Sequence, residues 1–281
     1  MKLLGLVCIT MVGFAANSIL TRVGVNAYGM DPLAFAVIRV AAGALTLGLL
    51  VIIQGQSPFL KIGQRWKGAL ALTTYIIGFS TAYLSLDAGM GALILFGLLQ
   101  IMMFGWAIFQ GQTVTAMRWV GAIFALIGLV VLLWPSGEKV LPLGGTLAMI
   151  FATAGWAVYT ILGQALRDPL QASAGNFILC LPLVAVSLVF AGGELPLGGI
   201  VSALFSGAVT SGLAYALWYR VLPHLNITIA AVAQLSVPVL AVGAGVVFLA
   251  EPLTLRLLVA GLLVLGGIAV ANIRSVSARR K

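Results

Sequence analysis

The chain has 281 residues, of which 62% are hydrophobic and 7% are charged, and its mean hydropathy is +1.18. A soluble domain carries about 25% charged residues, so this composition excludes a soluble protein and predicts a polytopic membrane protein. The net charge is +9, but the basic residues fall in loops and at the C-terminus, as expected beside a bilayer surface. We therefore expect no nucleic-acid partner, and no segment is long or polar enough for a soluble catalytic head.

Ten apolar segments follow one another along the chain, separated by turn-forming residues such as Asp31 and Pro32. Each is about 20 residues long, which lets an α-helix cross a hydrocarbon core of about 30 Å. The sequence therefore predicts an all-α polytopic membrane protein with ten transmembrane helices. The expected spans are 3–24, 32–54, 67–86, 89–110, 116–134, 143–163, 172–191, 198–221, 227–249 and 255–273.

Polar and aromatic residues mark the first three segments. Asn17 and Ser18 lie at mid-depth in the first segment, where they can either join helices by hydrogen bonds or face a substrate. Arg22 and Arg39 lie nearer segment ends, where we expect the guanidinium groups to reach out to lipid headgroups. The alternative for either residue is an inward side chain that meets a substrate carboxylate. Tyr83, in the third segment, is a further aromatic candidate for the substrate site.

Amides and rings continue this pattern in the later segments. Gln100 in the fourth segment and Gln234 in the ninth must face protein or a cavity, because a lipid-facing amide is costly. Trp156 and Tyr159 share a face of the sixth segment, and Tyr215 lies deep in the eighth. The predicted substrate-binding residues are Asn17, Tyr83, Gln100, Trp156, Tyr159, Tyr215 and Gln234.

Two features concern movement and packing. Pro238, inside the ninth segment, would kink that helix and is the candidate hinge. Ala203, Gly207 and Ser211 are spaced four apart in the eighth segment, and such small residues let helices approach closely.

Four tryptophans fit the interfacial aromatic belt of a membrane protein because they fall at or near segment ends. These are Trp66, Trp119, Trp134 and Trp218.

The reactive side chains form no catalytic or metal-binding pattern. Cys8 and Cys180 fall inside apolar runs without the spacing of a disulfide or a metal site, and His224 falls in a loop. All six acids fall at or near loops. We therefore predict no catalytic residues, no metal, no cofactor and no enzymatic activity, and the missing mid-membrane acid disfavours proton-coupled export of cationic drugs.

One cassette, two apolar runs joined by a polar hinge, occurs twice. The clearer copy spans 228–272, with its hinge at Glu251, and a weaker copy spans 93–134, with its hinge at Gln112. In the clearer copy, Glu251 and the proline after it are expected to end one helix and start the next. A repeated cassette indicates a chain made of two related halves. The equivalent positions are Gln112 and Glu251, Thr115 and Thr254, Val120 and Val259, and Gly128 and Gly267.

The distribution of Lys and Arg sets the expected orientation. With a cytoplasmic N-terminus, eleven of the fifteen basic residues fall on the cytoplasmic side, and both termini are inside. The other four are Arg22, Arg39, Lys139 and Arg256. We expect a multi-pass membrane protein in this orientation.

The two halves are predicted as 1–138 and 139–281, with five helices each. Because five is odd, the second half must begin on the opposite face, which makes an inverted repeat with a pseudo-two-fold axis in the membrane plane. This arrangement is typical of secondary transporters, whose substrate sites lie near the midplane between the repeats.

Short motifs occur in a characteristic order along nearly the whole chain. They are 13–17 (GFAAN), 31–35 (DPLAF) with Arg39, 155–159 (GWAVY), 215–219 (YALWY), 234–238 (QLSVP) and 251–254 (EPLT). In this order they resemble the drug/metabolite transporter superfamily, specifically its EamA-like ten-helix family. The resemblance implies a carrier of small metabolites with a central cavity lined mainly by the first, third, fourth, sixth, eighth and ninth helices.

The chain departs from this family pattern at three positions. Phe14 stands where the family often has Trp, Leu99 where it usually has Pro, and Gln112 where it usually has Glu. The run 87–97 resembles a bacterial branch, which implies the bacterial inner membrane. Amino-acid and aromatic-metabolite exporters are the characterised relatives nearest in kind.

The leading hypothesis is a carrier that works by alternating access and exports amino acids, aromatic or otherwise neutral, or similar small metabolites. Export of drugs or cationic toxic compounds, or of nucleotide sugars or cofactors, stays open as an alternative within the same class. An intramembrane enzyme is a more distant alternative. The expected partners are a small-molecule substrate and the lipid bilayer, and the protein is a monomer or a homodimer.

Overall fold

The computed structural model describes residues 2–59, 63, 65–111, 115–134, 142–164, 168–221, 224, 233–234 and 236–273. Within these residues the chain is helical and contains no strand. Seven helical segments are long and apolar enough to cross a membrane, and further shorter apolar helices accompany them. The expectation of an all-α polytopic membrane protein is confirmed.

The helices follow the expected spans closely. The first half contains α1 (Lys2–Arg22), η1 (Val23–Ala27), α2 (Pro32–Ile53), α3 (Trp66–Ala82), α4 (Ala88–Phe109) and α5 (Ala116–Leu133). The second contains α6 (Leu143–Gln164), α7 (Pro169–Val186), η3 (Ser187–Phe190), α8 (Leu197–Phe205), η4 (Ser206–Leu213), α9 (Ala214–Val221), α11 (Ser236–Leu249) and α12 (Leu255–Ile273).

Turn chemistry explains several helix starts. Asp31 caps α2 by accepting hydrogen bonds from the backbone N–H groups of Leu33 and Ala34, and Pro32 occupies the first helical position. Asp168 and Pro169 start α7 in the same way. Such pairs end one span and begin the next, which is why hydropathy and turn residues located these boundaries well.

Two π-helical segments were not predicted. η1 extends α1, and η4 lies between α8 and α9, so that the expected eighth span is one helical run from 197 to 221 with a wider central part. π-Helical turns are rare and are often found at functional sites. η4 carries Ser206, Thr210 and Ser211, three hydroxyl groups that face buried polar partners.

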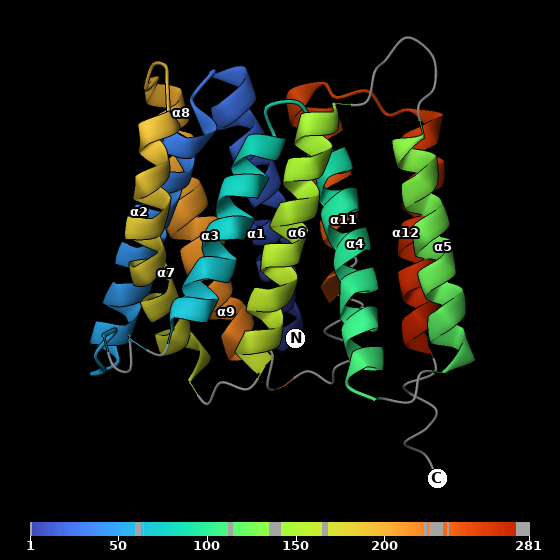
Figure 1. Cartoon of the computed structure of the whole chain (residues 1–281), viewed down its shortest axis with the longest axis horizontal. Helices are drawn as coiled ribbons and strands as arrows, with labels where there is room; N and C mark the ends of the chain where they lie inside the picture. Colours follow the sequence, from blue (N-terminus) through green and yellow to red (C-terminus); the bar gives the residue numbers. More distant parts are fainter. Residues whose placement is uncertain are drawn as a thin grey trace.

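Figure 1 shows the helices side by side, running in alternating directions between two faces. The terminal face is the one at which α1 begins and α12 ends. The opposite face carries the turns around 28–31, 83–87 and 250–254. In Figure 1, α1 runs upward from the terminal face and α6 runs downward toward it, as opposite orientations of two halves require.

The contact between α5 and α12 is reciprocal. A Cβ atom at Gly128 would lie 2.9 Å from the carbonyl oxygen of Ala260, and one at Gly267 would lie 2.5 Å from that of Gly121. Gly128 and Gly267 are equivalent positions in the repeated cassette, and so are Gly121 and Ala260. This exchange of roles is the pattern that a two-fold axis between the helices produces. The predicted boundary at 138 and 139 lies outside the described residues.

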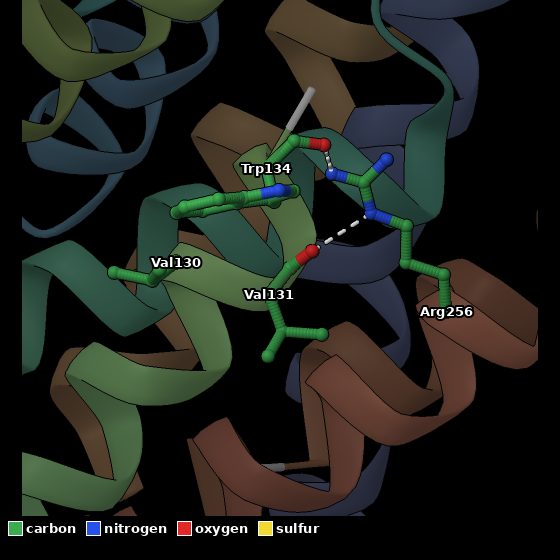
Figure 2. A pocket seen from close by; sticks show the side chains of 4 residues that line it. All are labelled: Val130, Val131, Trp134 and Arg256. Carbon is green, nitrogen blue, oxygen red and sulfur yellow. Dashed lines mark hydrogen bonds between the residues drawn. The ribbon is translucent and has the colours of Figure 1, made fainter. Parts of the chain in front are cut away.

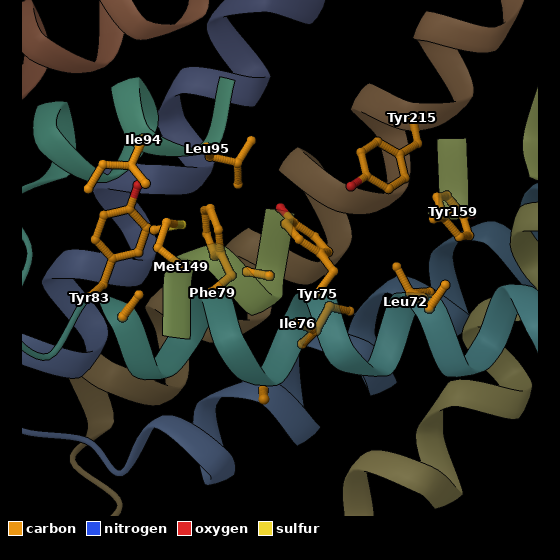
Figure 3. Packing of buried hydrophobic residues seen from close by; sticks show 14 of the residues in the cluster. Leu72, Tyr75, Ile76, Phe79, Tyr83, Ile94, Leu95, Met149, Tyr159 and Tyr215 are labelled. Carbon is orange, nitrogen blue, oxygen red and sulfur yellow. The ribbon is translucent and has the colours of Figure 1, made fainter. Parts of the chain in front are cut away.

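Buried apolar side chains from several helices surround the middle of the bundle. Figure 3 shows Phe79 of α3 and the adjacent Tyr83 beside Leu95 and Ile94 of α4, and Leu72 of α3 beside Tyr159 of α6. The core holds α3, α4 and α6 together around the space described next.

Candidate functional site

A small cavity of about 30 Å³ lies at the centre of the bundle. It is enclosed by aromatic rings, hydroxyls and amides from both halves of the chain. This space is far smaller than the roughly 300–1,000 Å³ of a small-molecule pocket, so the site must widen to bind a metabolite. The lining residues are Phe14, Asn17, Ser18, Tyr75, Phe79, Leu95, Phe96, Trp156, Thr210, Tyr215 and Gln234.

Trp156 is the centre of an aromatic cluster beside this cavity. Its ring lies 4.9 Å from that of Tyr75 and 5.4 Å from that of Tyr215, between centroids. Tyr159 stacks on Trp156 at 5.6 Å, and its hydroxyl donates a hydrogen bond to Ser173 Oγ at 3.3 Å. Trp156 and Tyr215 thus line the cavity, whereas Tyr159 supports Trp156 from behind.

Asn17 combines the two roles that the sequence left open. Its Oδ1 atom accepts hydrogen bonds from Ser206 Oγ at 2.7 Å and from Thr210 Oγ1 at 3.0 Å, which joins α1 to η4. The buried Asn17 side chain also lines the cavity. The two donors lie on the π-helical segment, so η4 presents its hydroxyls to the first helix.

The expectation that Arg39 reaches the lipid headgroups is wrong. Its side chain is fully buried, Nε donates to Ser211 Oγ at 3.1 Å, and Nη2 donates to Tyr75 OH at 3.3 Å. The guanidinium also lies over the rings of Phe79 and Tyr75, 5.1 and 5.4 Å from their centroids. Helix α2 begins at Pro32, so Arg39 lies two turns inside it, where hydroxyls and ring faces hold the cation.

Arg22 does not extend to headgroups either, but joins a polar cluster at the opposite face. Its Nη2 atom lies 3.2 Å from Asp87 Oδ1, and its Nε atom lies 3.8 Å from Glu251 Oε1. Nη1 donates to the carbonyl oxygen of Tyr83 at 2.9 Å. This cluster, Arg22, Asp87 and Glu251, connects α1, the α3–α4 turn and the α11–α12 turn.

Glu251 caps a helix, but not the one beside it in the sequence. Its Oε1 atom accepts a hydrogen bond from the backbone N–H of Ala88 at 2.8 Å, and Oε2 lies 3.5 Å from that of Gly89. These N–H groups start α4, so the carboxylate caps a helix of the other half. Burial raises the pKa of Glu251 above its usual value, and the nearby Asp87 carboxylate adds to this, while the Ala88 hydrogen bond opposes it.

The other predicted site residues lie around the cavity. Gln234 lines it. Tyr83 is buried and packs edge-on against Phe79, with its hydroxyl 3.4 Å from the carbonyl oxygen of Ala88, outside the lining. Gln100 is half-buried one turn beyond Phe96 on α4 and is also outside the lining. These two residues are therefore not brought to the cavity in this conformation.

Pro238, the predicted hinge, is buried in α11, beside Val237. Whether it acts as a hinge stays a prediction.

Of the tryptophans expected in the interfacial belt, Trp66, Trp119 and Trp134 are exposed on the outside of the bundle. Trp218 instead packs against Phe14, with the ring centroids 6.1 Å apart, because α9 lies against α1.

A larger, open hollow of about 330 Å³ lies at the ends of α5 and α12 (Figure 2). It is lined by Val130, Val131, Trp134 and Arg256. Arg256 donates from Nε to the carbonyl oxygen of Val131 at 2.7 Å and from Nη2 to that of Trp134. Carbonyls at the end of a helix lack intrahelical partners, so Arg256 acts as a cap that fastens α12 to α5. We prefer the central cavity as the site because several helices of both halves converge there.

Sequence reasoning missed Tyr75 and Phe79, and for Arg39 it favoured the headgroups over the interior. The signal for the first two was the row Tyr75, Phe79 and Tyr83, spaced four apart on one face of a helix. The signal for Arg39 was its distance from the proline that starts its helix. Among the described residues, no cluster of three or more His, Cys, Asp or Glu could hold a metal ion.

Comparison with known proteins gives concordant matches. The family model described as "EamA-like transporter family" matches residues 143–273. An uncharacterized protein of Pseudomonas aeruginosa is 42% identical over 267 residues, covering 94% of this chain and 92% of that protein. An uncharacterized transporter of Archaeoglobus fulgidus is 28% identical, covering 86% of this chain and 88% of that protein.

Two more distant matches also cover nearly the whole chain. The uncharacterized transporter YoaV of Bacillus subtilis is 22% identical, covering 95% of this chain and 94% of that protein. A solved crystal structure superposes with a TM-score of 0.68 at 20% identity, covering 97% of this chain and 99% of the solved one. At this identity the likeness supports the fold alone.

Proposed function

We propose that this chain, which belongs to the EamA-like transporter family, is a carrier that moves small metabolites across the membrane by alternating access. The observation that carries the proposal is the central cavity, which is lined by polar and aromatic side chains from both halves. Binding sites of secondary transporters lie at such an interface between repeats.

The cycle needs one face of the cavity to open while the other is closed. In this structure, the cluster of Arg22, Asp87 and Glu251 joins the helices at the opposite face. We assign this cluster as the gate of that face, so its ion pairs and the Ala88 hydrogen bond must break when the face opens. The terminal face is assigned to the cytoplasm, and both termini lie there, as the distribution of basic residues favours.

The assigned substrates are amino acids, aromatic or otherwise neutral, and similar small metabolites, with export as the direction. The cavity offers the indole of Trp156, phenol rings and the amides of Asn17 and Gln234. No carboxylate is among its described lining residues, which makes the cavity a poor site for a cationic drug. The membrane is assigned as the bacterial inner membrane, and the unit as a monomer or homodimer.

Flux into proteoliposomes tests this proposal. Purified protein is reconstituted, and uptake of a panel of labelled amino acids is compared with that of protein-free liposomes. We expect protein-dependent flux that Trp156→Ala reduces without loss of folded protein. Trp66→Ala is the matched control, because Trp66 is exposed at the start of α3, away from the cavity lining. If no amino acid shows protein-dependent flux, the substrate assignment is refuted.

A further inference from the structure

Arg39 is a cation whose charge the described part of the protein does not neutralise. Its side chain is fully buried, and Nη1 is a buried donor without a hydrogen-bond partner. The other two nitrogens meet neutral hydroxyls, on Ser211 and Tyr75. A buried guanidinium normally pairs with a carboxylate, because an unpaired buried charge is costly.

The acids of the described chain are elsewhere. Asp31 and Asp168 cap α2 and α7, Asp87 and Glu251 meet Arg22, and Glu194 is exposed in a loop. The ion pairs found among the described residues involve Arg22 and not Arg39. A positive charge therefore remains in the middle of the bundle.

This charge lies next to the central cavity. Tyr75 and Phe79, whose rings cover the guanidinium, also line the cavity, and Ser211 directly follows the lining residue Thr210. Figure 3 shows Tyr75 and Phe79 on one helix with Tyr215 across from them. The rings of Tyr75 and Phe79 thus lie both over Arg39 and at the cavity, and binding through Nη1 requires a shift of one of them.

We propose that Arg39 is the binding group for a carboxylate of the substrate, so that the site takes organic carboxylates with an aromatic or apolar remainder. The assignment rests on the proposed transport function, because it names the substrate class of the same cavity. A carboxylate oxygen accepts from Nη1, and a second oxygen displaces the neutral hydroxyl of Tyr75. Charge-assisted bonds of this kind are shorter and stronger than the neutral ones they replace. The rings of Trp156 and Tyr215 then hold the apolar part.

A purely structural role makes a different prediction. If Arg39 only ties α2 to α3 and η4, its replacement weakens folding and affects every ligand alike. If it binds a carboxylate, its replacement affects ligands according to whether they carry that group.

Matched ligand pairs separate these two roles. The full-length protein in lipid nanodiscs is titrated with L-phenylalanine and L-phenylalaninamide, and with phenylacetate and phenylacetamide. Binding is followed by the shift in unfolding temperature. We expect each carboxylate bound by wild type to bind roughly ten- to hundredfold more weakly to Arg39→Gln, with the amides unaffected. Arg39→Lys is expected to lie between, because lysine keeps the charge but lacks the planar fork of donors.

One control variant and one fallback variant complete the design. Arg220→Gln removes an exposed guanidinium and should leave the carboxylate preference unchanged. Arg39→Lys decides the question if Arg39→Gln does not fold, because it keeps the charge but lacks the Nη1 donor, so its carboxylate preference should be smaller than that of wild type.

The proposal is overturned if wild type binds no carboxylate more tightly than its amide, if Arg39→Gln weakens both members of a pair equally, or if Arg39→Lys keeps the full preference of wild type. Binding of both L-phenylalanine and phenylacetate supports a site for carboxylates in general, and binding of L-phenylalanine alone supports one for amino acids. Arg39-dependent binding without flux in proteoliposomes refutes the transport function but supports the carboxylate site. Flux without a carboxylate preference supports the transport function but refutes the carboxylate site.

Discussion

Replacement of Glu251 by alanine should release the start of α4 and loosen the gate at the opposite face. The Glu251 carboxylate accepts from the N–H of Ala88 at 2.8 Å, while Asp87, at the N-cap position itself, makes no side-chain capping bond. The Glu251→Ala variant therefore removes the cap that reaches α4 from the α11–α12 turn. It also removes one of the two acids beside Arg22.

The expected loss follows from three contributions. An N-cap is worth about 1 kcal/mol, and a carboxylate at the positive end of a helix adds about 0.5 kcal/mol. The pair with Arg22 adds less than about 1 kcal/mol, because its atoms are 3.8 Å apart and Arg22 keeps Asp87. Burial of the charge, which raises the pKa of Glu251, offsets part of this sum, so about 1–2 kcal/mol remains, which corresponds to a factor of about 5–30 in the equilibrium between closed and open gate.

Hydrogen–deuterium exchange measures this loss locally. The N–H groups of Ala88 and Gly89 lack intrahelical partners, so their protection depends on Glu251. We expect up to about 30-fold faster exchange there in Glu251→Ala. Glu194→Ala is the control, because Glu194 is an exposed acid at the same face. Unchanged exchange at Ala88 in Glu251→Ala, or an equal change in the control, would refute the reasoning.

Three further outcomes are expected. Because burial raises the pKa of Glu251 in the closed gate, protonation of Glu251 favours the closed gate. Opening should therefore increase as pH rises from 4.5 through the raised pKa, as hydrogen–deuterium exchange at the start of α4 will measure. The variant Glu251→Gln should remove this pH dependence. Gly128→Ala should destabilise the protein by about 1–3 kcal/mol, because the added Cβ would meet the α12 backbone. Gly266→Ala is the control: its Cβ meets no other atom, so it should stabilise the protein by up to about 1 kcal/mol. Thermal unfolding in detergent measures both effects. Trp156→Ala should reduce amino-acid flux more than Gln100→Ala does, because only Trp156 lines the cavity in this conformation; an equal reduction would contradict that assignment.

The helices could be predicted from the sequence because their signals are local. Asp31 and Pro32 start α2 by capping, and continuous apolar runs of sufficient length mark the spans. The π-helical segment η4 could not be predicted. In η4, Ser206 and Thr210 donate hydrogen bonds to Asn17 of α1, and such tertiary contacts cannot be read from local sequence. Hydropathy also does not distinguish a π-helical run from an α-helical one.

The site was partly predictable for the same reason. A polar or aromatic side chain at mid-depth must face protein, and this placed Asn17, Trp156, Tyr215 and Gln234 at the cavity. The direction of Arg39 depends on the rotation of α2 about its axis, which is set by close contact between its backbone and Gly207 on η4. That contact joins residues far apart in the sequence.

Glu251 shows the same limit in another form. Its capping chemistry was evident from the residue type, but the helix that it caps, α4, begins at Ala88, far away in the chain. Local sequence indicates that a carboxylate will cap a helix, and the tertiary fold decides which one.

The central claim is that the cavity opens to each side of the membrane in turn. A single cysteine at Ser18, which lines the cavity, tests it in a Cys8→Ser and Cys180→Ser background. A membrane-impermeant thiol reagent is applied to reconstituted protein from one side or the other. We expect labelling from either side, with Glu251→Ala shifting it toward the face that carries residue 251. Labelling from neither side in any variant, or from one side only, would contradict the account.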